Sequence, residues 1–267
     1  MEKRNILITG GDSFLAKSIS EYFPSDFNVN YASRAEIDCR DLDSLRKGLC
    51  RRIAYDTVIH TAVMGGRRHD EDNSDIFYNN VVSSENIISC HQDGFFKKLI
   101  VFGSGSESIN GASKKAYQLS KYIQTNRVRG VSGISNLRIF GLFSKFRNND
   151  FITACISGCI NNAKIEIWED KCFDFIYAQD LASIILNQIV DPINNYKEID
   201  CVYEKKYMLS EIAEIIKTIS HSNSCIQING ISGQPYTGYK NWVLGNEVGL
   251  KEGIKRIIYA NYSNNAL

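Results

Sequence analysis

A tyrosine and a lysine stand four residues apart in the segment Tyr117-Gln118-Leu119-Ser120-Lys121. On a helix this spacing places the phenol and the ammonium group on one face. The pKa of a free tyrosine is about 10, and a neighbouring cation lowers it by favouring the phenolate. A phenol tuned in this way can give or take a proton near neutral pH. Tyr117 and Lys121 are therefore candidates for acid–base chemistry, although a single pair of this kind is common by chance and is usually structural.

Two hydroxyl groups follow the strand that precedes this pair. The apolar run Leu99–Phe102 predicts a buried strand, and Gly103-Ser104-Gly105-Ser106 comes directly after it. A hydroxyl at that strand end can reach a carbonyl oxygen that the tyrosine polarises. Ser104 and Ser106 are both candidates for this position.

The amino-terminal segment reads as strand, tight turn and helix. The apolar run Ile6–Thr9 ends in Gly10-Gly11, and helical spacing begins at Phe14. Such a turn lets backbone N–H groups and a helix start face a pyrophosphate. A Gly-x-x-Gly-x-x-Gly pattern reads here as Gly10, Ser13 and Ala16. Ser and Ala are small, so a dinucleotide can still approach closely, but an ordinary strand turn would look similar.

The end of the next strand suggests which dinucleotide is preferred. NAD-preferring folds usually carry an acidic residue there, whereas an arginine suits the 2′-phosphate of NADP. This chain has Ala32-Ser33-Arg34, and a guanidinium fork with a hydroxyl matches a phosphate. Asp38 and Asp41 follow, one to face the adenine and one to cap a helix. We therefore predict that the protein binds NADP(H) in preference to NAD(H).

Strands and helices alternate along the first half of the chain. The predicted strands are Asn5–Thr9, Asn28–Ala32, Thr57–Thr61, Leu99–Phe102 and Ser135–Ile139, and the predicted helices are Phe14–Tyr22, Leu42–Arg52, Asp75–Cys90 and Lys114–Arg129. This order is typical of an α/β fold with a doubly wound parallel (Rossmann) sheet. In such a sheet the ligand crevice lies beyond the carboxyl ends of the strands.

The second half is less regular and predicts a small interleaved substrate lobe. We expect helices at Phe151–Asn162, Asp180–Ile189, Ser210–Ile219 (capped by Ser210) and Gly249–Ala260, with strands at Lys164–Trp168 and Ile199–Val202. The predicted division is a dinucleotide-binding domain over residues 1–163 and a substrate-binding lobe over most of residues 164–267, with some segments returning to the sheet.

Together these features resemble the extended short-chain dehydrogenase/reductase family, in its nucleotide-sugar branch of NAD-dependent epimerases and dehydratases. The similarity covers nearly the whole chain. Besides Ser104, Tyr117 and Lys121, it rests on the segments Ile6–Ala16, Asp56–Ala62, Asn80–Asn86, Asn136–Gly141, Phe173–Asp180 and Gly249–Ile254. One departure is Phe173, where the family often has an arginine that clamps the diphosphate of the sugar nucleotide.

The resemblance implies roles for individual residues. Tyr117 would be the general acid or base, Lys121 would bind the nicotinamide ribose and lower the pKa of Tyr117, and Ser104, with Ser106 in reserve, would bind the reacting oxygen. The implied cofactor-binding residues are Gly10, Asp12, Ser13, Phe14, Leu15, Ser33, Arg34, Asp38, Thr61, Ala62, Val63, Tyr117 and Lys121. Substrate contacts are assigned to Ser106, Arg138 and Phe140.

Within the family the pattern is similar to GDP-fucose synthases, which epimerise and then reduce a 4-keto sugar. Those enzymes use a cysteine and a histidine for epimerisation, and ungapped matching places Ser106 and Phe143 at these positions. Neither side chain can exchange the required proton. The resemblance therefore implies an NADPH-dependent reductase of a nucleotide-activated 4-keto-6-deoxy sugar, in the biosynthesis of surface-polysaccharide sugars. Hydride would reach C4, and Tyr117 would protonate the oxygen.

Three alternative functions stay open. A 4-epimerase would retain NAD, and the absence of an acidic residue beside Arg34 argues against it. A 4,6-dehydratase needs carboxylates, which Ser104-Gly105-Ser106 lacks. A non-catalytic NAD(P)-binding relative is the third alternative, although such proteins commonly lose the tyrosine or the lysine.

Composition excludes several classes of protein. The 267 residues include 31 Lys plus Arg and 30 Asp plus Glu, so the net charge is +1. This charge is too small to indicate electrostatic binding to nucleic acid or to an anionic membrane. No apolar run reaches the roughly 20 residues that span a bilayer, and the first residues do not resemble a signal peptide, which predicts a cytoplasmic protein. The eight cysteines form no Cys-x-x-Cys pair, and the four histidines have no metal-ligand spacing. We read His60 as a core residue and His69 as part of a solvated charged loop, and we expect a homodimer.

Overall fold

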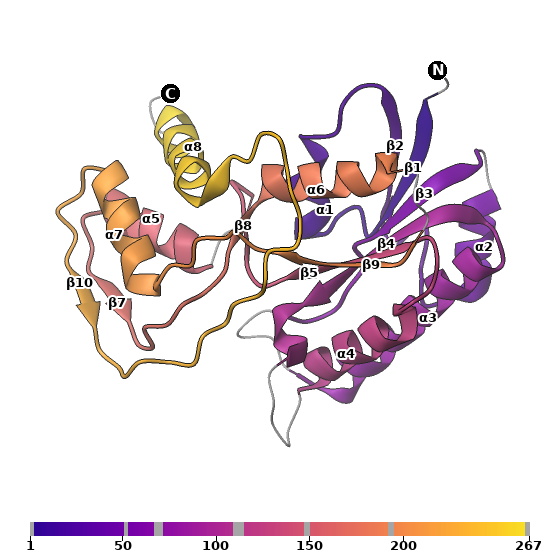
Figure 1. Ribbon diagram of the computed structural model, residues 1–267, viewed down its shortest axis with the longest axis horizontal. Coiled ribbons are helices and arrows are strands. Elements are labelled where there is room, and N and C mark those ends of the chain that lie inside the picture. Colours follow the sequence, from indigo (N-terminus) through magenta and orange to yellow (C-terminus); the bar gives the residue numbers. More distant parts are fainter. Residues whose placement is uncertain are drawn as a thin grey trace. The chain divides into compact units, whose positions relative to one another are not determined.

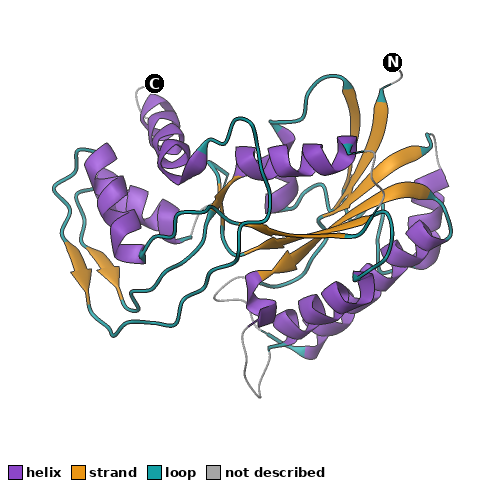
Figure 2. Ribbon diagram, in the orientation of Figure 1, coloured by secondary structure: helices purple, strands orange, loops and turns teal. Residues whose placement is uncertain are grey.

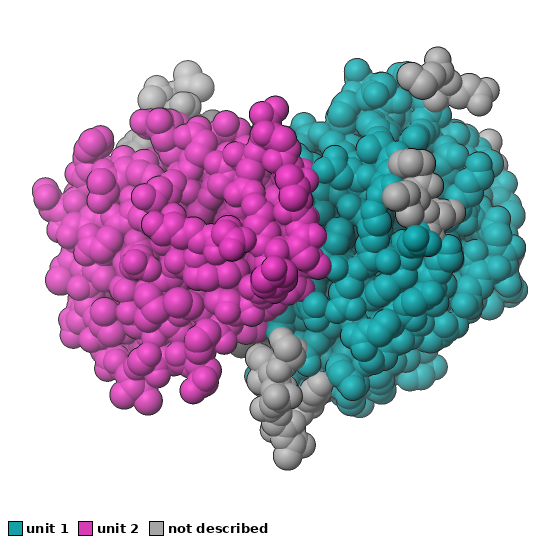
Figure 3. All heavy atoms as spheres, in the orientation of Figure 1, with its two compact units in different colours: residues 1–138, 182–199 teal, residues 139–181, 200–267 magenta. Residues whose placement is uncertain are grey.

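The chain folds into two compact units. The computed structural model describes residues 3–50, 53–66, 72–108, 115–146, 150–191 and 195–264. Unit 1 is residues 1–138 with 182–199, and unit 2 is residues 139–181 with 200–267 (Figure 3). The division predicted from the sequence lies near residue 163. In the structure residues 139–163 belong to unit 2, and residues 182–199 return to unit 1.

Unit 1 is built around a six-stranded sheet with the order β2-β1-β3-β4-β5-β9. Strand β1 pairs in parallel with β2 and β3, and β3 pairs in parallel with β4. Helices α2, α3 and α4 cover one face, and α1 and α6 cover the other (Figures 1 and 2). The predicted doubly wound Rossmann fold is confirmed. Its elements are β1 (Arg4–Thr9), α1 (Phe14–Ser20), β2 (Phe27–Ala32), α2 (Leu42–Cys50), β3 (Tyr55–His60), α3 (Ser74–Gln92), β4 (Phe96–Ser104), the short 3₁₀ turn η1 (Gly105–Ser108), α4 (Ala116–Val128), β5 (Ile134–Ile139), α6 (Ala178–Val190) and β9 (Lys197–Cys201).

The core of this unit forms because its central strands are apolar on both faces. The last four residues of β1 are all buried, as expected for a parallel strand covered by helices on both sides. Leu7 and Val58 on the strands pack with Leu45 of α2 and Ile87 of α3 in one continuous cluster. Each such side chain contributes about 1.5–3 kcal/mol on burial. This packing fixes the strand ends from which the candidate site residues extend.

The winding of the sheet changes direction beside β1. Strand β2 lies on one side of β1 and β3 on the other, with Thr9 opposite both Ala32 and His60. Ligands of doubly wound sheets bind beyond the carboxyl ends at such a switch point. The turn after Thr9 and the loop after His60 are therefore the expected borders of a ligand-binding site.

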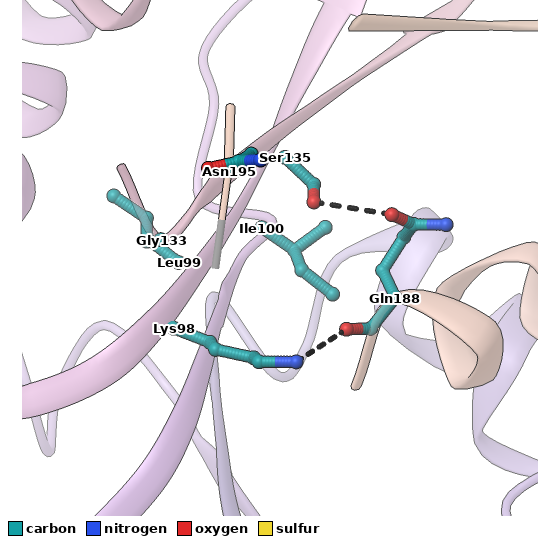
Figure 4. A pocket seen from close by; sticks show the side chains of 7 residues that line it. All are labelled: Lys98, Leu99, Ile100, Gly133, Ser135, Gln188 and Asn195. Carbon is teal, nitrogen blue, oxygen red and sulfur yellow. Dashed lines mark hydrogen bonds between the residues drawn. The ribbon is translucent and has the colours of Figure 1, made fainter. Parts of the chain in front are cut away.

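A small pocket lies at the opposite, amino-terminal end of β4 and β5 (Figure 4). The Lys98 ammonium group donates there to the carbonyl oxygens of Gln188 and Ile189, at 3.0 and 3.2 Å, and of Asp191. Arg4 donates to the Ile189 carbonyl as well. Cations at a helix carboxyl end satisfy its last carbonyl groups. Lys98 and Arg4 therefore hold the carboxyl end of α6 at this pocket.

Unit 2 contains short elements that the sequence analysis only partly predicted. They are β6 (Leu142–Phe143), α5 (Phe151–Ile160), β7 (Ile165–Ile167), β8 (Ile176–Tyr177), α7 (Leu209–Ile219), β10 (Ile226–Ile228) and α8 (Gly249–Asn264). β6 pairs with β8 and β7 with β10, each pair in parallel. Strands β6, β8 and β10 were not predicted, whereas β7, which is also three residues long, lies within the predicted strand Lys164–Trp168.

The predicted cap of α7 is wrong. Met208 is the residue that precedes the helix, and Ser210 lies in its first turn. There the Ser210 amide and hydroxyl groups both donate to the carboxylate of Asp170, at 3.0 and 2.7 Å. The first turn of α7 is therefore held by a carboxylate forty residues earlier in the chain.

Candidate active site

The turn after β1 requires a glycine. Gly10 has a φ of +69°, and a Cβ there would lie 2.7 Å from the backbone of Ala62. Ser13 caps α1 by accepting the Ala16 N–H at 3.1 Å, and its hydroxyl lies 2.9 Å from that of Thr61. The two loops at the switch point are thus bound to each other. They present a backbone cradle of the kind that fits a dinucleotide pyrophosphate.

The other predicted cofactor residues near the switch point differ in their exposure. Asp12 is exposed, and Phe14 and Leu15 are half-buried at the start of α1. Ala62 is half-buried and Val63 is exposed. Asp12 lies in the turn after β1, Phe14 and Leu15 lie in the first turn of α1, and Ala62 and Val63 lie in the loop after β3.

The end of β2 carries an acidic residue that the sequence analysis overlooked. One carboxylate oxygen of Glu36 accepts both the N–H and the hydroxyl of Ser33, each at 2.8 Å. These bonds lower the pKa of Glu36. The expectation that no acidic group stands beside Arg34 is therefore wrong, because Glu36 folds back across the intervening turn to the strand end.

Arg34 itself is largely exposed. Its side chain is 62% accessible, and its Nε lies 3.7 Å from a carboxylate oxygen of Asp38. Asp38 is held mainly by Arg40, whose Nε donates at 2.9 Å, and this partner lowers the pKa of Asp38 to about 2. Asp41 caps α2, accepting the Ser44 N–H at 3.2 Å, as predicted. The Arg34 guanidinium group is thus accessible to a ligand at this strand end.

Asn80 positions the loop that follows β3. Its side-chain amide exchanges two hydrogen bonds with the backbone of Met64, at 2.8 and 3.0 Å, and also donates to Ser120 at 3.2 Å. Because Asn80 lies on α3 and Ser120 on α4, one buried amide holds the loop against both helices.

The Tyr117 ring packs against the end of this loop. A Cβ on Gly66, which has a φ of +89°, would lie 2.8 Å from the ring and 3.2 Å from the phenol oxygen. The carboxylate of Asp72 accepts the N–H groups of Ala116 and Tyr117 at 2.7 and 3.0 Å. Asp72 therefore fixes the start of α4, and Gly66 leaves room for the tyrosine.

We expect Gly66→Ala to lower turnover on the order of 10²-fold, since a displacement of about 1 Å at a reacting group can cost that much. Gly130→Ala is the matched control, because Gly130 also has a positive φ of +78° but no atom within 4 Å of its would-be Cβ. Both variants place alanine at a positive φ, but only Gly66→Ala brings a Cβ against the Tyr117 ring, so only Gly66→Ala should lose activity. Equal activity losses in both would show that backbone strain alone is responsible.

Lys121 is buried one helical turn after Tyr117, with 6% of its surface accessible. Its ammonium group donates to the Phe102 carbonyl at 2.8 Å and to Gln124 at 3.3 Å. Burial lowers the pKa of Lys121 to about 8, and the charge of Glu107 acts in the opposite direction. A lysine with this pKa is still mainly cationic at neutral pH and can change its charge within a physiological range.

Ser104 and Ser106 lie together at the end of β4. Their hydroxyl oxygens are 2.8 Å apart, and the Ser106 N–H donates to the Ser104 hydroxyl at 3.2 Å. Both residues are buried. The two candidate serines are therefore hydrogen-bonded to each other at this strand end.

His60 is a core residue. Its Nδ1 lies 2.8 Å from the Thr9 hydroxyl and its Nε2 lies 3.4 Å from that of Ser83. Burial, with a contribution from the charge of Lys121, lowers the pKa of His60 to about 3. The imidazole is therefore neutral at pH 7, and its hydrogen bonds are structural. His69 lies outside the described residues.

The predicted substrate residues have partners within their own units. Arg138 forms an ion pair with Glu198 at 2.8 Å in unit 1. In unit 2, Phe140 packs edge-on against Tyr236 with 5.3 Å between ring centroids, and Phe173 lies 4.8 Å from the same ring. Phe173, which replaces the expected arginine, is thus part of a half-buried aromatic cluster.

Neither a membrane-spanning helix nor a metal-binding cluster is present in the described ranges. No helix in them is long and apolar enough to cross a membrane. The same part of the chain contains no group of three or more His, Cys, Asp or Glu side chains that could hold a metal ion. All eight cysteines are free thiols.

Residues 6–192 match the model of the NAD dependent epimerase/dehydratase family. The chain belongs to this family. The match spans the glycine turn, the serine pair and the Tyr117–Lys121 helix. Membership makes the protein an NAD(P)-dependent enzyme and confirms the predicted family. No curated protein matches the sequence significantly.

Solved structures of similar fold cover nearly the whole chain. A GDP-mannoheptose C4 reductase from Campylobacter jejuni with NADP bound has a TM-score of 0.76 and 17% identity, over 98% of this chain and 99% of that one. The dTDP-4-dehydrorhamnose reductase of Bacillus anthracis in complex with NADP has a TM-score of 0.79 and 18% identity, over 97% and 99%. The UDP-glucose 4-epimerase of Thermus thermophilus in complex with NAD has a TM-score of 0.73 and 14% identity, over 99% and 100%. At these identities the similarity defines the fold.

Proposed function

We propose that this protein is an NADPH-dependent reductase that converts the ketone of a nucleotide-activated 4-keto-6-deoxy sugar into an alcohol, in the cytoplasmic synthesis of surface-polysaccharide sugars. The observation that carries the proposal is the Tyr117–Lys121 pair, with the phenol seated on Gly66 and the lysine buried beneath the strand end. The reductases among the structural neighbours support the substrate class.

We assign each of these residues a separate role in the reduction of the ketone. When bound, NADPH supplies a hydride and leaves as NADP⁺. The Tyr117 phenol donates the proton that the ketone oxygen takes up, so that C=O becomes CH–OH. The Lys121 ammonium group favours the phenolate that remains, and the Ser104–Ser106 pair offers a hydrogen bond to the reacting oxygen. The phenolate is reprotonated from solvent.

The preference for NADPH rests on Arg34 and Ser33. A guanidinium group and a hydroxyl bind phosphate through charge-assisted hydrogen bonds. Glu36 holds the two Ser33 donors, so a 2′-phosphate bound there has to displace its carboxylate. The exposed Arg34 side chain then supplies the opposite charge.

Arg34→Ala is expected to weaken NADPH binding by about tenfold or more, the equivalent of one charge-assisted hydrogen bond, and to leave NADH binding unchanged. Arg46→Ala, which removes an exposed arginine paired with Asp93, is the matched control and should change neither affinity. Fluorescence titration of both cofactors measures the effect. Tighter binding of NADH than NADPH by the unmodified protein would refute the preference.

One observation favours a second function, a 4-epimerase that retains NAD. Acidic groups at the end of the second strand bind the ribose 2′-hydroxyl in NAD-preferring folds, and Glu36 brings a carboxylate to that place. Such an enzyme would leave its cofactor unchanged over the full reaction. Net oxidation of NADPH therefore separates the two functions.

Reduction without epimerisation follows from Ser106 and Phe143. Phe143 is fully buried against Tyr177 in unit 2 and has no proton to exchange. We expect NADPH oxidation with at least one member of a panel of nucleotide-linked 4-keto sugars, with no deuterium at C3 or C5 of the product formed in D₂O. Deuterium at either carbon would contradict the assignment of Ser106 and Phe143.

We also propose a homodimer that pairs helices α3 and α4 of two copies. These helices pack together and expose Tyr78, Leu119 and Tyr122, and clusters of exposed large apolar residues often mark interaction sites. Sedimentation velocity at micromolar concentration should give the mass of a dimer. A monomer under those conditions would contradict this proposal.

A further inference from the structure

A buried carboxylate lies directly behind the serine pair. Glu107 belongs to the short turn η1 and has only 6% of its surface accessible. Its Oε1 accepts the backbone N–H of Ser104 at 2.5 Å. A Cβ at Gly103 would lie 2.7 Å from the same oxygen, so glycine at this position is what lets the carboxylate pack against the strand end.

Polar and charged side chains from helix α4 and strand β5 surround Glu107. Thr125 on α4 hydrogen-bonds its carboxylate, and the Thr125 hydroxyl also accepts from Asn136 of β5 at 3.0 Å. Burial raises the pKa of Glu107 above its usual value, and the hydrogen bonds from Ser104 and Thr125 and the charges of Arg138 and Lys121 act in the opposite direction. Burying a carboxylate costs several kcal/mol unless it has partners of this kind.

We propose that Glu107 is a positioning residue that fixes Ser104 through its backbone and keeps the ammonium form of Lys121 in the buried site. The proposal rests on the proposed function, because it assigns Glu107 a part in the same reduction. Glu107 acts through Ser104 and Lys121, and its carboxylate lies behind the strand end that bears the serine pair.

The charged groups around Lys121 make the electrostatic part of the proposal specific. Glu107 is the anion that raises the pKa of Lys121 against the effect of burial. His60 faces Lys121 from β3 and is neutral, because its pKa is about 3. Tyr117 lies one turn away on the same helix, and Arg138 on β5 is paired with Glu198 of β9. Loss of the Glu107 charge would lower the pKa of each neighbouring acid or base, whichever of them controls the rate.

The test is Glu107→Gln, which keeps an oxygen for the Ser104 N–H and removes the charge. NADPH affinity and kcat/KM of the unmodified protein should fall as the pH rises and Lys121 loses its proton. In the variant the midpoint of this loss should move to lower pH by about one unit or more. Glu85→Gln is the matched control, because it removes an exposed glutamate that pairs with Arg127 at 3.0 Å, and its profile should match the unmodified protein.

A Glu107→Gln profile that superimposes on the unmodified one, whatever its melting temperature, would overturn the proposal. If Glu107→Gln does not fold, Glu107→Asp decides the question, since it keeps the charge and shortens the reach to Ser104. An unchanged midpoint with lower kcat supports the proposal, and a moved midpoint contradicts it. The binding profile needs no sugar, so it tests Glu107 even if no 4-keto sugar is reduced, which would count against the proposed function alone.

Discussion

Tyr117→Phe should lower kcat for ketone reduction by about 10²-fold or more, the usual contribution of a general acid, while the dissociation constant for NADPH stays the same. The variant keeps the aromatic ring that packs on Gly66 and loses only the hydroxyl group. A 10²-fold change corresponds to about 2.7 kcal/mol of transition-state stabilisation. Single-turnover kinetics with bound NADPH measure the chemical step directly.

The control for this substitution lies on the same helix. Tyr122 is 45% exposed on α4, and Tyr122→Phe removes a hydroxyl group with no assigned role in the reaction. Its kcat should equal that of the unmodified protein. Near-normal turnover by Tyr117→Phe would remove this residue from the mechanism.

Lys121→Met is expected to lower kcat by about 10²-fold or more and to weaken NADPH binding, because the variant loses the cation that we propose favours the Tyr117 phenolate and donates to the cofactor ribose. Methionine has a similar length and no charge, so the core is expected to stay packed. The Phe102 carbonyl keeps a partner in Gln124, which donates to it at 3.1 Å. Circular dichroism should show a folded protein.

The pH dependence of this effect has a definite sign. The pKa of Lys121 is about 8, so its ammonium form is present below that pH and is lost as the pH rises through it. NADPH affinity of the unmodified protein should therefore fall above pH 8, and the affinity of Lys121→Met should not change over this range. Lys115→Met removes an exposed lysine just before α4 and should preserve the unmodified profile. A pH-independent affinity in the unmodified protein would contradict the role of Lys121.

The sequence predicts unit 1 well because its elements are long and their apolar periods are clear. Each strand of the Rossmann sheet and each of its helices lies within a few residues of the predicted range, including α3 (Ser74–Gln92) and β4 (Phe96–Ser104). Unit 2 is harder, since β6 and β8 contain two residues each. Strands of that length are defined by their partners and not by their own composition.

The starts of some helices are also hard to predict from the sequence, because their capping groups are distant in the chain. Three helices begin against carboxylates from distant parts of the chain: Asp72 for α4, Asp170 for α7 and Asp180 for α8, where Asp180 accepts the Val248 and Gly249 N–H groups at 2.8 and 2.9 Å. Local sequence rules search for a cap within a few residues of the helix start. They could find Asp41 before α2 but not these three.

Some residues of the candidate site are predictable from the sequence, and others are not. Gly10, Tyr117 and Lys121 are recognisable because their chemistry depends on short fixed spacings. Glu36 and Glu107 are only three residues from the serines that they contact, but the contact depends on a turn whose geometry no spacing rule specifies. The position of Glu36 in particular contradicts the expectation from the sequence that Arg34 has no acidic neighbour.

The most direct test of the account is the fate of the cofactor hydrogen. Incubation of the protein with NADPH that carries deuterium at C4, in each of its two stereospecific forms, and with a nucleotide-linked 4-keto-6-deoxy sugar should oxidise NADPH in proportion to the sugar reduced. One of the two labelled forms should place its deuterium on C4 of the sugar. Conversion of the sugar without net loss of NADPH, or a product with no deuterium at C4 from either form, would contradict the account.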